Sequence, residues 1–273
     1  MANRVRYIDS ITEGVSRWAS KRFGRSTRVS RGSVLLVNLM GALEHSGIYL
    51  GNARVAELYN DDGVGRAQIV PLWEFLYGQD GEGVRWGSCV YAACTAGEVM
   101  LADERIAKVA EKFVRERRRV DYGVFRNNCH LFSMSCIAGR YLPERDFPEL
   151  LTEGTTSVGE LQNMISEKLN GGDDVCWRPA KAINEILGIN NNVLNFNVPT
   201  LTGGGKSFWA TIDRWNGWKL QKNDVFGNTR ILDSKNYRKA WATGSDGESA
   251  LLEMMDRLRQ CEMIYKGQCS DII

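Results

Sequence analysis

One cysteine and two histidines are the residues of this chain whose chemistry stands out. Cys129 lies in the segment NNCHLF (127–132) and is followed directly by His130. His45 lies far upstream, in EHSGIYLGNARVAEL (44–58), and the 273 residues contain no third histidine. A thiol becomes a strong nucleophile when it loses its proton, and both an adjacent imidazole and a helix N-terminus favour that loss. The pattern therefore suggests nucleophilic catalysis by a thiol–imidazole pair.

His45 is better placed than His130 to act as the base for Cys129. Neighbouring residues on a helix differ in direction by about 100°, so His130 points away from Cys129. His45 begins a strand-like segment that tertiary folding can bring to the cysteine. A catalytic imidazole also needs a group that fixes its tautomer, and Glu57 follows His45 by twelve residues. Across a short hairpin this spacing can place the two side chains next to each other, depending on the register.

The segment after Asn128 predicts the helix that must carry Cys129. Cys129, Phe132 and Cys136 share one helical face, together with their neighbours in CHLFSMSCIA. Asn128 is a favoured N-cap residue, and Gly139 is a favoured residue for the end of the helix. This capping places Cys129 in the first turn, where the helix dipole stabilises a thiolate.

The segments around His45 predict the sheet that must carry the base. β-Branched runs indicate strands, Gly-Asn between two such runs indicates a hairpin, and a change to a three- and four-residue apolar spacing indicates a helix. These signals predict a strand at 33–39, a hairpin of HSGIYLG and RVAELYN joined by residues 51–53, a strand followed by a helical turn at 67–78, and an amphipathic helix within 98–120.

Composition excludes several classes of function. The chain is 43% hydrophobic and 25% charged with a formal net charge of +2, so no nucleic-acid partner is expected. The dense basic cluster RERRR (115–119) is interpreted as a solvated helix end. No apolar run is long enough to span a bilayer and no secretory signal is expected, which favours a cytoplasmic protein with reduced thiols. Seven cysteines without a CxxC pair predict neither a zinc site nor any other cofactor. The six cysteines other than Cys129 are expected to fill space: Cys89, Cys94, Cys136, Cys176, Cys261 and Cys269.

The sequence divides into three parts. Residues 1–148 contain the signals above and are expected to form the catalytic domain. Residues 149–206 have a looser, Asn- and Gly-rich texture and are expected to be a connector of one helix and loops. Residues 207–273 are rich in tryptophan and predict a small β-hairpin followed by a helix at 247–267. The tryptophans are interpreted as a small core, or as anchors for a protein partner.

Two segments resemble signatures of the lecithin:retinol acyltransferase-like family. HSGIYLGNARVAEL resembles the first signature, H-x-G-I-Y-L-G followed by a polar residue in the next strand. DYGVFRNNCHLF resembles the second, Y-x-x-x-x-x-N-C-x-x-F, and the two occur in the expected order within residues 30–140. The family belongs to a circularly permuted branch of papain-like thiol enzymes. The resemblance implies an α+β fold in which an antiparallel sheet packs against a helix bearing the cysteine, here with a smaller C-terminal α/β appendage.

The resemblance assigns a role to each residue of the candidate site. It makes Cys129 the nucleophile, His45 the general base and Glu57 the orienting residue. Tyr122, seven residues before the cysteine, matches a tyrosine that assists the oxyanion site, and Asn128 is expected to help orient that site as the helix cap. The animal enzymes usually have a histidine at the position of Glu57, but a carboxylate there can also orient His45 and favour its protonated form.

The implied function is cysteine-dependent acyl transfer through a thioester, of the phospholipase or acyltransferase type. A lipid or another acylated small molecule is the expected substrate, and peripheral contact with a membrane is compatible with it. The C-terminal hydrophobic anchor of the animal enzymes is not expected here, which argues against a retinoid substrate held in the membrane. A cysteine peptidase or amidase of the same fold is the first alternative. A binding or regulatory module without turnover is the second, and a role as toxin, effector or defence component is compatible with the enzymatic readings.

Overall fold

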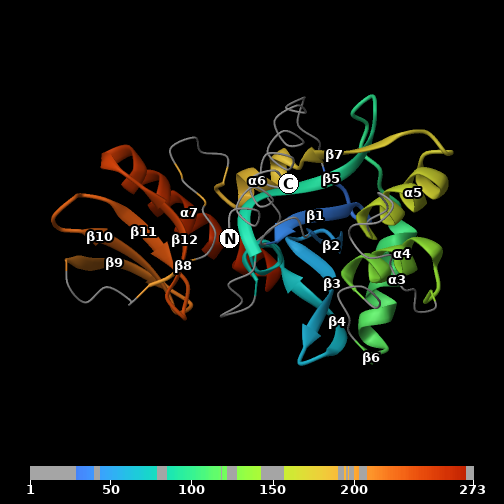
Figure 1. Cartoon of the computed structure of the whole chain (residues 1–273), viewed down its shortest axis with the longest axis horizontal. Coiled ribbons are helices and arrows are strands. Elements are labelled where there is room, and N and C mark those ends of the chain that lie inside the picture. The colour runs from blue at the N-terminus through green and yellow to red at the C-terminus, as the bar shows by residue number, and fades with distance from the viewer. Residues whose placement is uncertain are drawn as a thin grey trace, which may run out of the picture.

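A seven-stranded antiparallel sheet is the largest element of the fold (Figure 1). The computed structural model describes residues 29–39, 44–78, 85–117, 119–121, 128–142, 157–189, 194, 196, 200–202 and 208–268. Within these residues the sheet has the order β6-β4-β3-β2-β1-β5-β7. Its strands are β1 (Val34–Leu39), β2 (Glu44–Tyr49), β3 (Arg54–Asp61), β4 (Val64–Pro71), β5 (Arg85–Thr95), β6 (Arg119–Asp121) and β7 (Val175–Pro179).

Three helices cover one face of this sheet: α3 (Glu104–Arg115), α4 (Cys129–Ala138) and α5 (Ser157–Leu169). Because strand side chains alternate between faces, Leu36 and Ile48 point to this side and pack with Phe132 of α4. The helix that bears Cys129 therefore lies against β2 and β3, as the sequence predicts. The chain is of the mixed α+β class.

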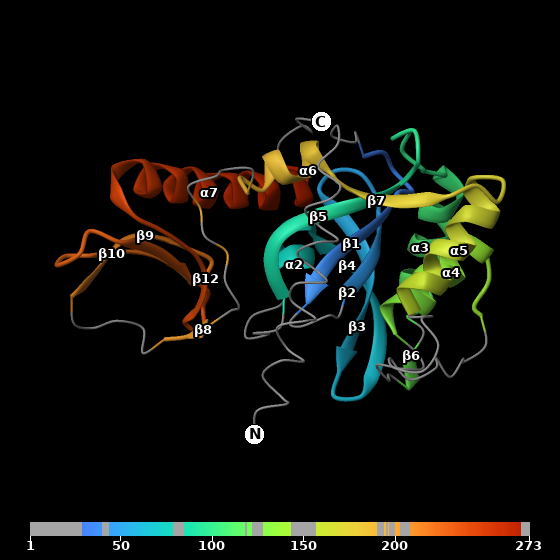
Figure 2. The same ribbon diagram turned by 45° about the horizontal axis from the view of Figure 1, so that its top comes forward.

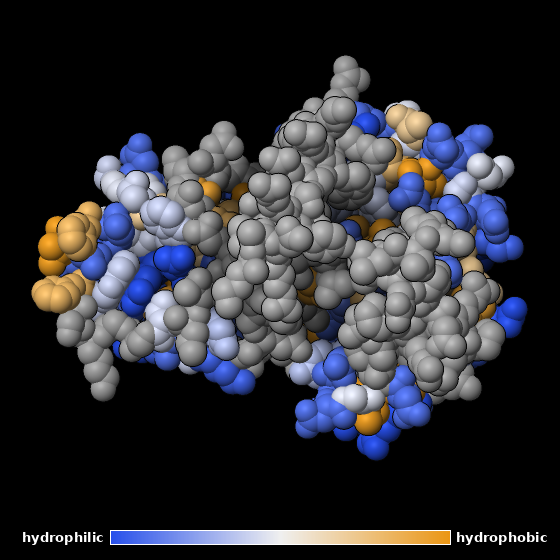
Figure 3. Space-filling model, in the orientation of Figure 1, coloured by the Kyte–Doolittle hydropathy of each residue, from blue (hydrophilic) through white to orange (hydrophobic). Residues whose placement is uncertain are grey.

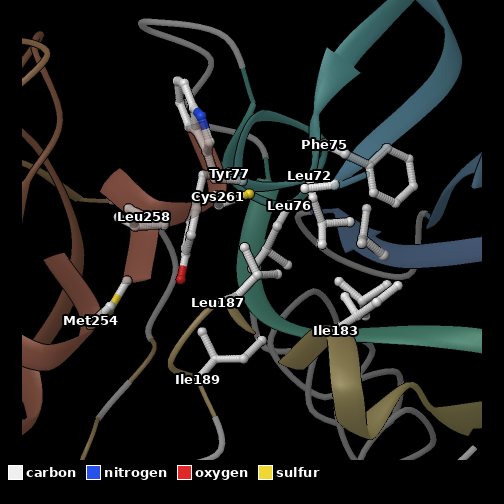
Figure 4. Packing of buried hydrophobic residues seen from close by; sticks show 14 of the residues in the cluster. Leu72, Phe75, Leu76, Tyr77, Ile183, Leu187, Ile189, Met254, Leu258 and Cys261 are labelled. Atoms are coloured by element: carbon white, nitrogen blue, oxygen red, sulfur yellow. The ribbon is translucent and has the colours of Figure 1, made fainter. Parts of the chain in front are cut away.

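The opposite face of the sheet packs against α2 (Leu72–Tyr77), α6 (Lys181–Ile186) and α7 (Gly244–Tyr265). Figure 4 shows side chains of all three helices meeting in this core, among them Phe75, Ile183 and Leu258. Leu258 is fully buried although α7 is the last element of the described chain. The core thus joins residues far apart in the sequence.

The C-terminal part forms a second antiparallel sheet of five strands, in the order β8-β12-β11-β10-β9. Its strands are β8 (Thr200–Leu201), β9 (Trp209–Trp215), β10 (Trp218–Asn223), β11 (Thr229–Leu232) and β12 (Tyr237–Ala242). Figure 2 shows α7 extending from this sheet toward α6 beside the larger one. Trp218 packs edge-on against Trp73 of α2, with ring centroids 5.9 Å apart. The expected hairpin and last helix are present, and they share a hydrophobic core with the larger sheet.

Residues 149–206, expected to be a connector, contribute more structure than the sequence indicates. β7 pairs with β5 at the edge of the large sheet, and α5 packs against α4. The amphipathic helix expected within 98–120 is present but shorter, because the Asp103 side chain accepts a hydrogen bond from the Arg105 amide and caps α3. None of the helices among the described residues combines the length and the apolar character needed to cross a bilayer.

Candidate functional site

The β2–β3 hairpin positions two of the expected site residues. Gly51, Asn52 and Ala53 all have positive φ (77°, 52° and 50°), which matches the hairpin predicted from the Gly-Asn pair. In the resulting register Gly47 pairs with Glu57, and His45 lies two residues before Gly47 on the same face of β2. His45 and Glu57 are therefore diagonal neighbours on one face of the sheet.

His45 and Glu57 form a buried hydrogen-bonded pair. The His45 Nε2 and Glu57 Oε2 atoms are 2.7 Å apart, and the two residues are 5% and 0% exposed. Gln68 of β4, opposite Glu57 in the register, donates from Nε2 to the other carboxylate oxygen at 3.0 Å. Both oxygens of Glu57 are thus engaged, which fixes the carboxylate and through it the imidazole. Gln68 was not predicted from the sequence, although it is an isolated polar residue in the strand-like run AQIVP.

The His45 ring also packs against Phe75 of α2. The two ring centroids are 5.4 Å apart. Phe75 can approach because position 47 is a glycine: a Cβ there would lie 2.8 Å from Phe75 Cε2 and 2.7 Å from Val55 Cγ1. The glycine in HSGIYLG therefore has a packing role beside the histidine. It allows an aromatic ring to set the orientation of the candidate base.

The start of α4 is built as the sequence predicts. The Asn128 side chain accepts hydrogen bonds from the amides of His130 and Leu131, both at 3.0 Å. Cys129 is consequently the first residue of the helix, and Gly139 ends it in the left-handed conformation with φ 73°. A thiolate at this position gains from the helix dipole.

Cys129 lies beside the segment of β2 that contains His45. Its Sγ is 4.0 Å from the carbonyl oxygen of Glu44, and its own carbonyl oxygen accepts a hydrogen bond from Ser46 Oγ at 3.1 Å. β2 pairs with β3 only from Gly47 to Tyr49, whereas β3 continues to Asp61 along β4. The first half of β2 therefore separates from β3, and the start of α4 contacts β2 at Glu44 and Ser46.

His130 has a structural role instead of a catalytic one. Its Nδ1 lies 3.0 Å from Ser46 Oγ, and its ring also hydrogen-bonds to the backbone of Glu44. Burial lowers the pKa of His130 to about 3, and the nearby His45 also disfavours its protonated form. The neutral ring thus attaches α4 to β2.

Glu44 is a further titratable group at this edge. Burial raises the pKa of its carboxyl to about 7, although its backbone carbonyl is the group that faces the Cys129 thiol. The sequence gives no signal for this, because a glutamate at the start of a strand is ordinarily exposed.

The other described cysteines lack a comparable setting. Cys94, Cys136, Cys176 and Cys261 are buried, and burial raises the pKa of the Cys136 thiol well above its usual value. Burial also raises the pKa of Cys261 to about 12 and of Cys89 to about 11. None of these thiols starts a helix. Cys129 is therefore the strongest candidate nucleophile among the described residues.

The structure describes four of the five expected site residues, in two groups. His45 and Glu57 are in direct contact, while Asn128 and Cys129 lie at the helix start against the His45 strand. Tyr122, expected at the oxyanion site, lies outside the described residues, as does Cys269. Among the described residues no group of three or more His, Cys, Asp or Glu side chains is arranged to hold a metal ion.

Comparison with known proteins adds no relative to this description. No protein-family model, curated protein or solved structure matches the chain.

Proposed function

We propose that the protein is a cysteine-dependent acyl-transfer enzyme that acts on lipid esters through a thioester intermediate. The observation that carries the proposal is a buried His45–Glu57 pair on the strand whose Glu44 and Ser46 contact Cys129, the first residue of a helix. The permuted papain-like arrangement is part of this proposal and is supported by the order of the residues, because the histidine strand precedes the cysteine helix. The two signature-like segments also favour a lipid ester over other acyl donors.

The ring nitrogens of His45 divide the roles that this chemistry requires. Nε2 bonds to Glu57, so Nδ1 is the nitrogen that serves the Cys129 thiol. The thiol proton passes to Nδ1, and the thiolate attacks the ester carbonyl to form a C–S bond. The oxyanion accepts hydrogen bonds from backbone amides at the start of α4. The C–O bond then breaks, and the alcohol leaves with the proton from His45.

The second half of the reaction releases the acyl group. Water, or an acceptor alcohol or amine, gives its proton to His45 and attacks the thioester carbonyl. The C–S bond breaks, and the Cys129 thiolate takes the proton back from His45. Glu57 stabilises the imidazolium that forms twice in each cycle, and it stays ionised throughout.

The proposal is tested by intact-mass measurement after incubation with lipid extracts, with peptide esters and with an acyl-fluorophosphonate probe. Wild type is expected to carry one adduct, acyl from an ester or phosphonyl from the fluorophosphonate with loss of fluoride. No adduct is expected on Cys129→Ala, and little on His45→Ala. Cys89→Ala is the matched control, because Cys89 is half-buried and lies within strand β5 instead of at the first position of a helix. Adducts from peptide esters alone would favour a peptidase or amidase with the same residues.

One observation favours a second function, a binding or regulatory module that keeps the fold without turnover. Cys129 is only 4% exposed. An acyl donor must reach the thiol, so a thiol that stays shielded in solution cannot act. Equal labelling of wild type and Cys129→Ala would therefore exclude the enzyme and leave the binding module.

A further inference from the structure

Two arginines and two tryptophans line a pocket on the C-terminal sheet, far from Cys129 in the fold. The cavity has a volume of about 150 Å³ and is lined by Trp209, Arg230, Arg238 and Trp241, with Asn228 and Thr229 at its edge. In Figure 3 strongly hydrophilic side chains lie over the region of β10–β12, which contains the two arginines. The expected small core and hairpin do not account for this polar pocket.

The strand register explains why these side chains share a face. Gln221 of β10 pairs with Arg230 of β11, which pairs with Trp241 of β12, so all three point to the same side. The register shifts between β11 and β12, so that Leu232 pairs with Arg238 and residue 239 is the extra residue of a β-bulge. The bulge turns Arg238 to the face of Arg230.

The two guanidinium groups are fixed by neutral partners. Arg230 is 8% exposed, stacks 3.7 Å from the Trp209 ring centroid, and donates two hydrogen bonds to Gln221 Oε1 at 3.1 and 2.9 Å. Arg238 lies 5.9 Å from the Trp241 ring centroid, and its buried Nε has no hydrogen-bond partner among the described residues. Neither arginine forms an ion pair with a carboxylate of the described chain. Two like charges are thus held together, and no carboxylate of the described residues compensates them.

This arrangement is costly unless an anion completes it. Burial and the nearby Arg238 both disfavour the charge on Arg230, and its pKa is lowered accordingly. Buried charges are normally paired, and an unpaired guanidinium donor is uncommon. Stacking on the indole rings leaves the in-plane N–H groups of Arg238, and those of Arg230 that do not bond to Gln221, available to a ligand.

We propose that this pocket binds a phosphate group. Arginine forks suit the tetrahedral oxygens of phosphate, and two guanidinium groups compensate its double charge. The cavity volume of about 150 Å³ is smaller than the roughly 300–1,000 Å³ typical of drug-sized ligands, so it suits one phosphate group and not a whole nucleotide. The inference is independent of the Cys129 chemistry.

The phosphate group can belong to a soluble ester or to a lipid. The turn between β10 and β11, close to the pocket, exposes the side chains of Val225 (59%) and Phe226 (77%). Phe208, which is 65% exposed, lies beside this turn, because its carbonyl oxygen accepts a hydrogen bond from the Asp224 amide. Figure 3 shows apolar residues at this outer end of the sheet. Such an apolar tip beside a phosphate site is suited to a lipid surface.

The proposal is tested by calorimetric titration with inorganic phosphate and glycerol 3-phosphate, and by co-sedimentation with phosphatidylcholine vesicles with or without phosphatidic acid. Wild type is expected to bind at least one phosphate probe, and Arg238→Gln is expected to bind it at least about tenfold more weakly, since a charged hydrogen bond is lost. Arg230→Lys keeps the charge but loses the fork, and it should also bind more weakly. Arg214→Gln is the matched control, because Arg214 is an exposed arginine on the same sheet.

The outcomes separate the sources and can overturn the site. If Phe226→Ser binds the soluble probes as tightly as wild type does, the natural ligand is a soluble phosphate ester. If wild type binds vesicles with phosphatidic acid and both Arg238→Gln and Phe226→Ser lose that binding, the natural ligand is a lipid headgroup. If wild type binds no phosphate probe, or if Arg214→Gln weakens binding as much as Arg238→Gln, the pocket is not a phosphate site. Thermal unfolding of each variant verifies that it is folded.

Discussion

His45 and Glu57 approach to 2.7 Å across the β2–β3 hairpin and are both buried, so the imidazole has one fixed orientation relative to the sheet. The second oxygen of the carboxylate is bound by Gln68 at 3.0 Å. A buried carboxylate without access to water requires such complete hydrogen bonding, because each unsatisfied oxygen would add to the cost of burial. The arrangement is more than packing needs, which is why it is interpreted as an orienting device for catalysis.

Replacing Glu57 should reduce catalysis more than it reduces folding. Glu57→Gln keeps the shape of the side chain but removes the charge that stabilises the imidazolium. In triads of this kind such a change lowers kcat by about 10²- to 10⁴-fold. The measurement is the rate of thioester formation at Cys129, followed by intact mass. Glu167→Gln, on the exposed face of α5, controls for the loss of one negative charge. Unchanged acylation in Glu57→Gln would remove Glu57 from the mechanism.

Gly47 should not tolerate even the single methyl group of an alanine side chain. In Gly47→Ala the new Cβ would lie within 3 Å of Val55, of Phe75 and of the Ala56 carbonyl oxygen. Overpacking of this kind costs about 1–3 kcal/mol, and displacement of Phe75 would also release the His45 ring. Urea denaturation and acylation rate measure the two effects. Gly97→Ala is the control, because its Cβ would have no contact closer than 3.7 Å. Equal stability of both variants would contradict the packing role.

The local parts of the site follow from the sequence. The N-cap Asn128, the helix end at Gly139 and the Gly-Asn hairpin depend on a few adjacent residues and on backbone sterics, so their types suffice to predict them. The register that joins His45 to Glu57 does not follow from the sequence in this way, because β2 is buried on both faces and the turn also shifts the pairing.

The long-range parts could not be predicted in the same way. β7 pairs with β5 across about eighty residues of sequence, and no local pattern specifies such a partner. Gln68 acquires its role only through its position opposite Glu57. Arg238 reaches the pocket with Trp209 and Arg230 only because a β-bulge shifts the register of β12. The residue types of a strand do not show where a bulge reverses the faces to which its side chains point.

The cap of α4 should contribute stability without contributing chemistry of its own. Asn128→Ala removes the acceptor of the His130 and Leu131 amides and should destabilise the protein by about 0.5–2 kcal/mol. Asn128→Asp keeps the acceptor and should restore that stability. However, it places a negative charge beside Cys129, which disfavours the thiolate and should slow acylation. Urea denaturation and the acylation rate distinguish the two effects. Equal destabilisation by both variants would show that the cap is not an oxygen acceptor.

Glu44 should make the stability of the protein depend on pH. Its carboxyl has a pKa of about 7 in the folded chain against an ordinary value of 4.5, because burial disfavours the carboxylate. The folded state therefore holds the proton more tightly than the unfolded state. Its contribution to stability is complete below pH 4.5 and is lost as the pH rises through 7. The loss is at most about 3 kcal/mol, at about 1.4 kcal/mol per tenfold change in proton affinity.

Glu44→Gln isolates this contribution, because the amide has a similar shape and does not ionise. Wild type and variant should have similar free energies of unfolding at pH 4.5, and the variant should be the more stable of the two at pH 8. Urea denaturation at several pH values between these limits gives the difference, and Glu167→Gln shows how much any lost carboxylate changes it. A difference that stays constant with pH would mean that the Glu44 carboxyl is solvated in the folded protein. A variant less stable at pH 8 would mean that a cation of the chain pairs with the carboxylate.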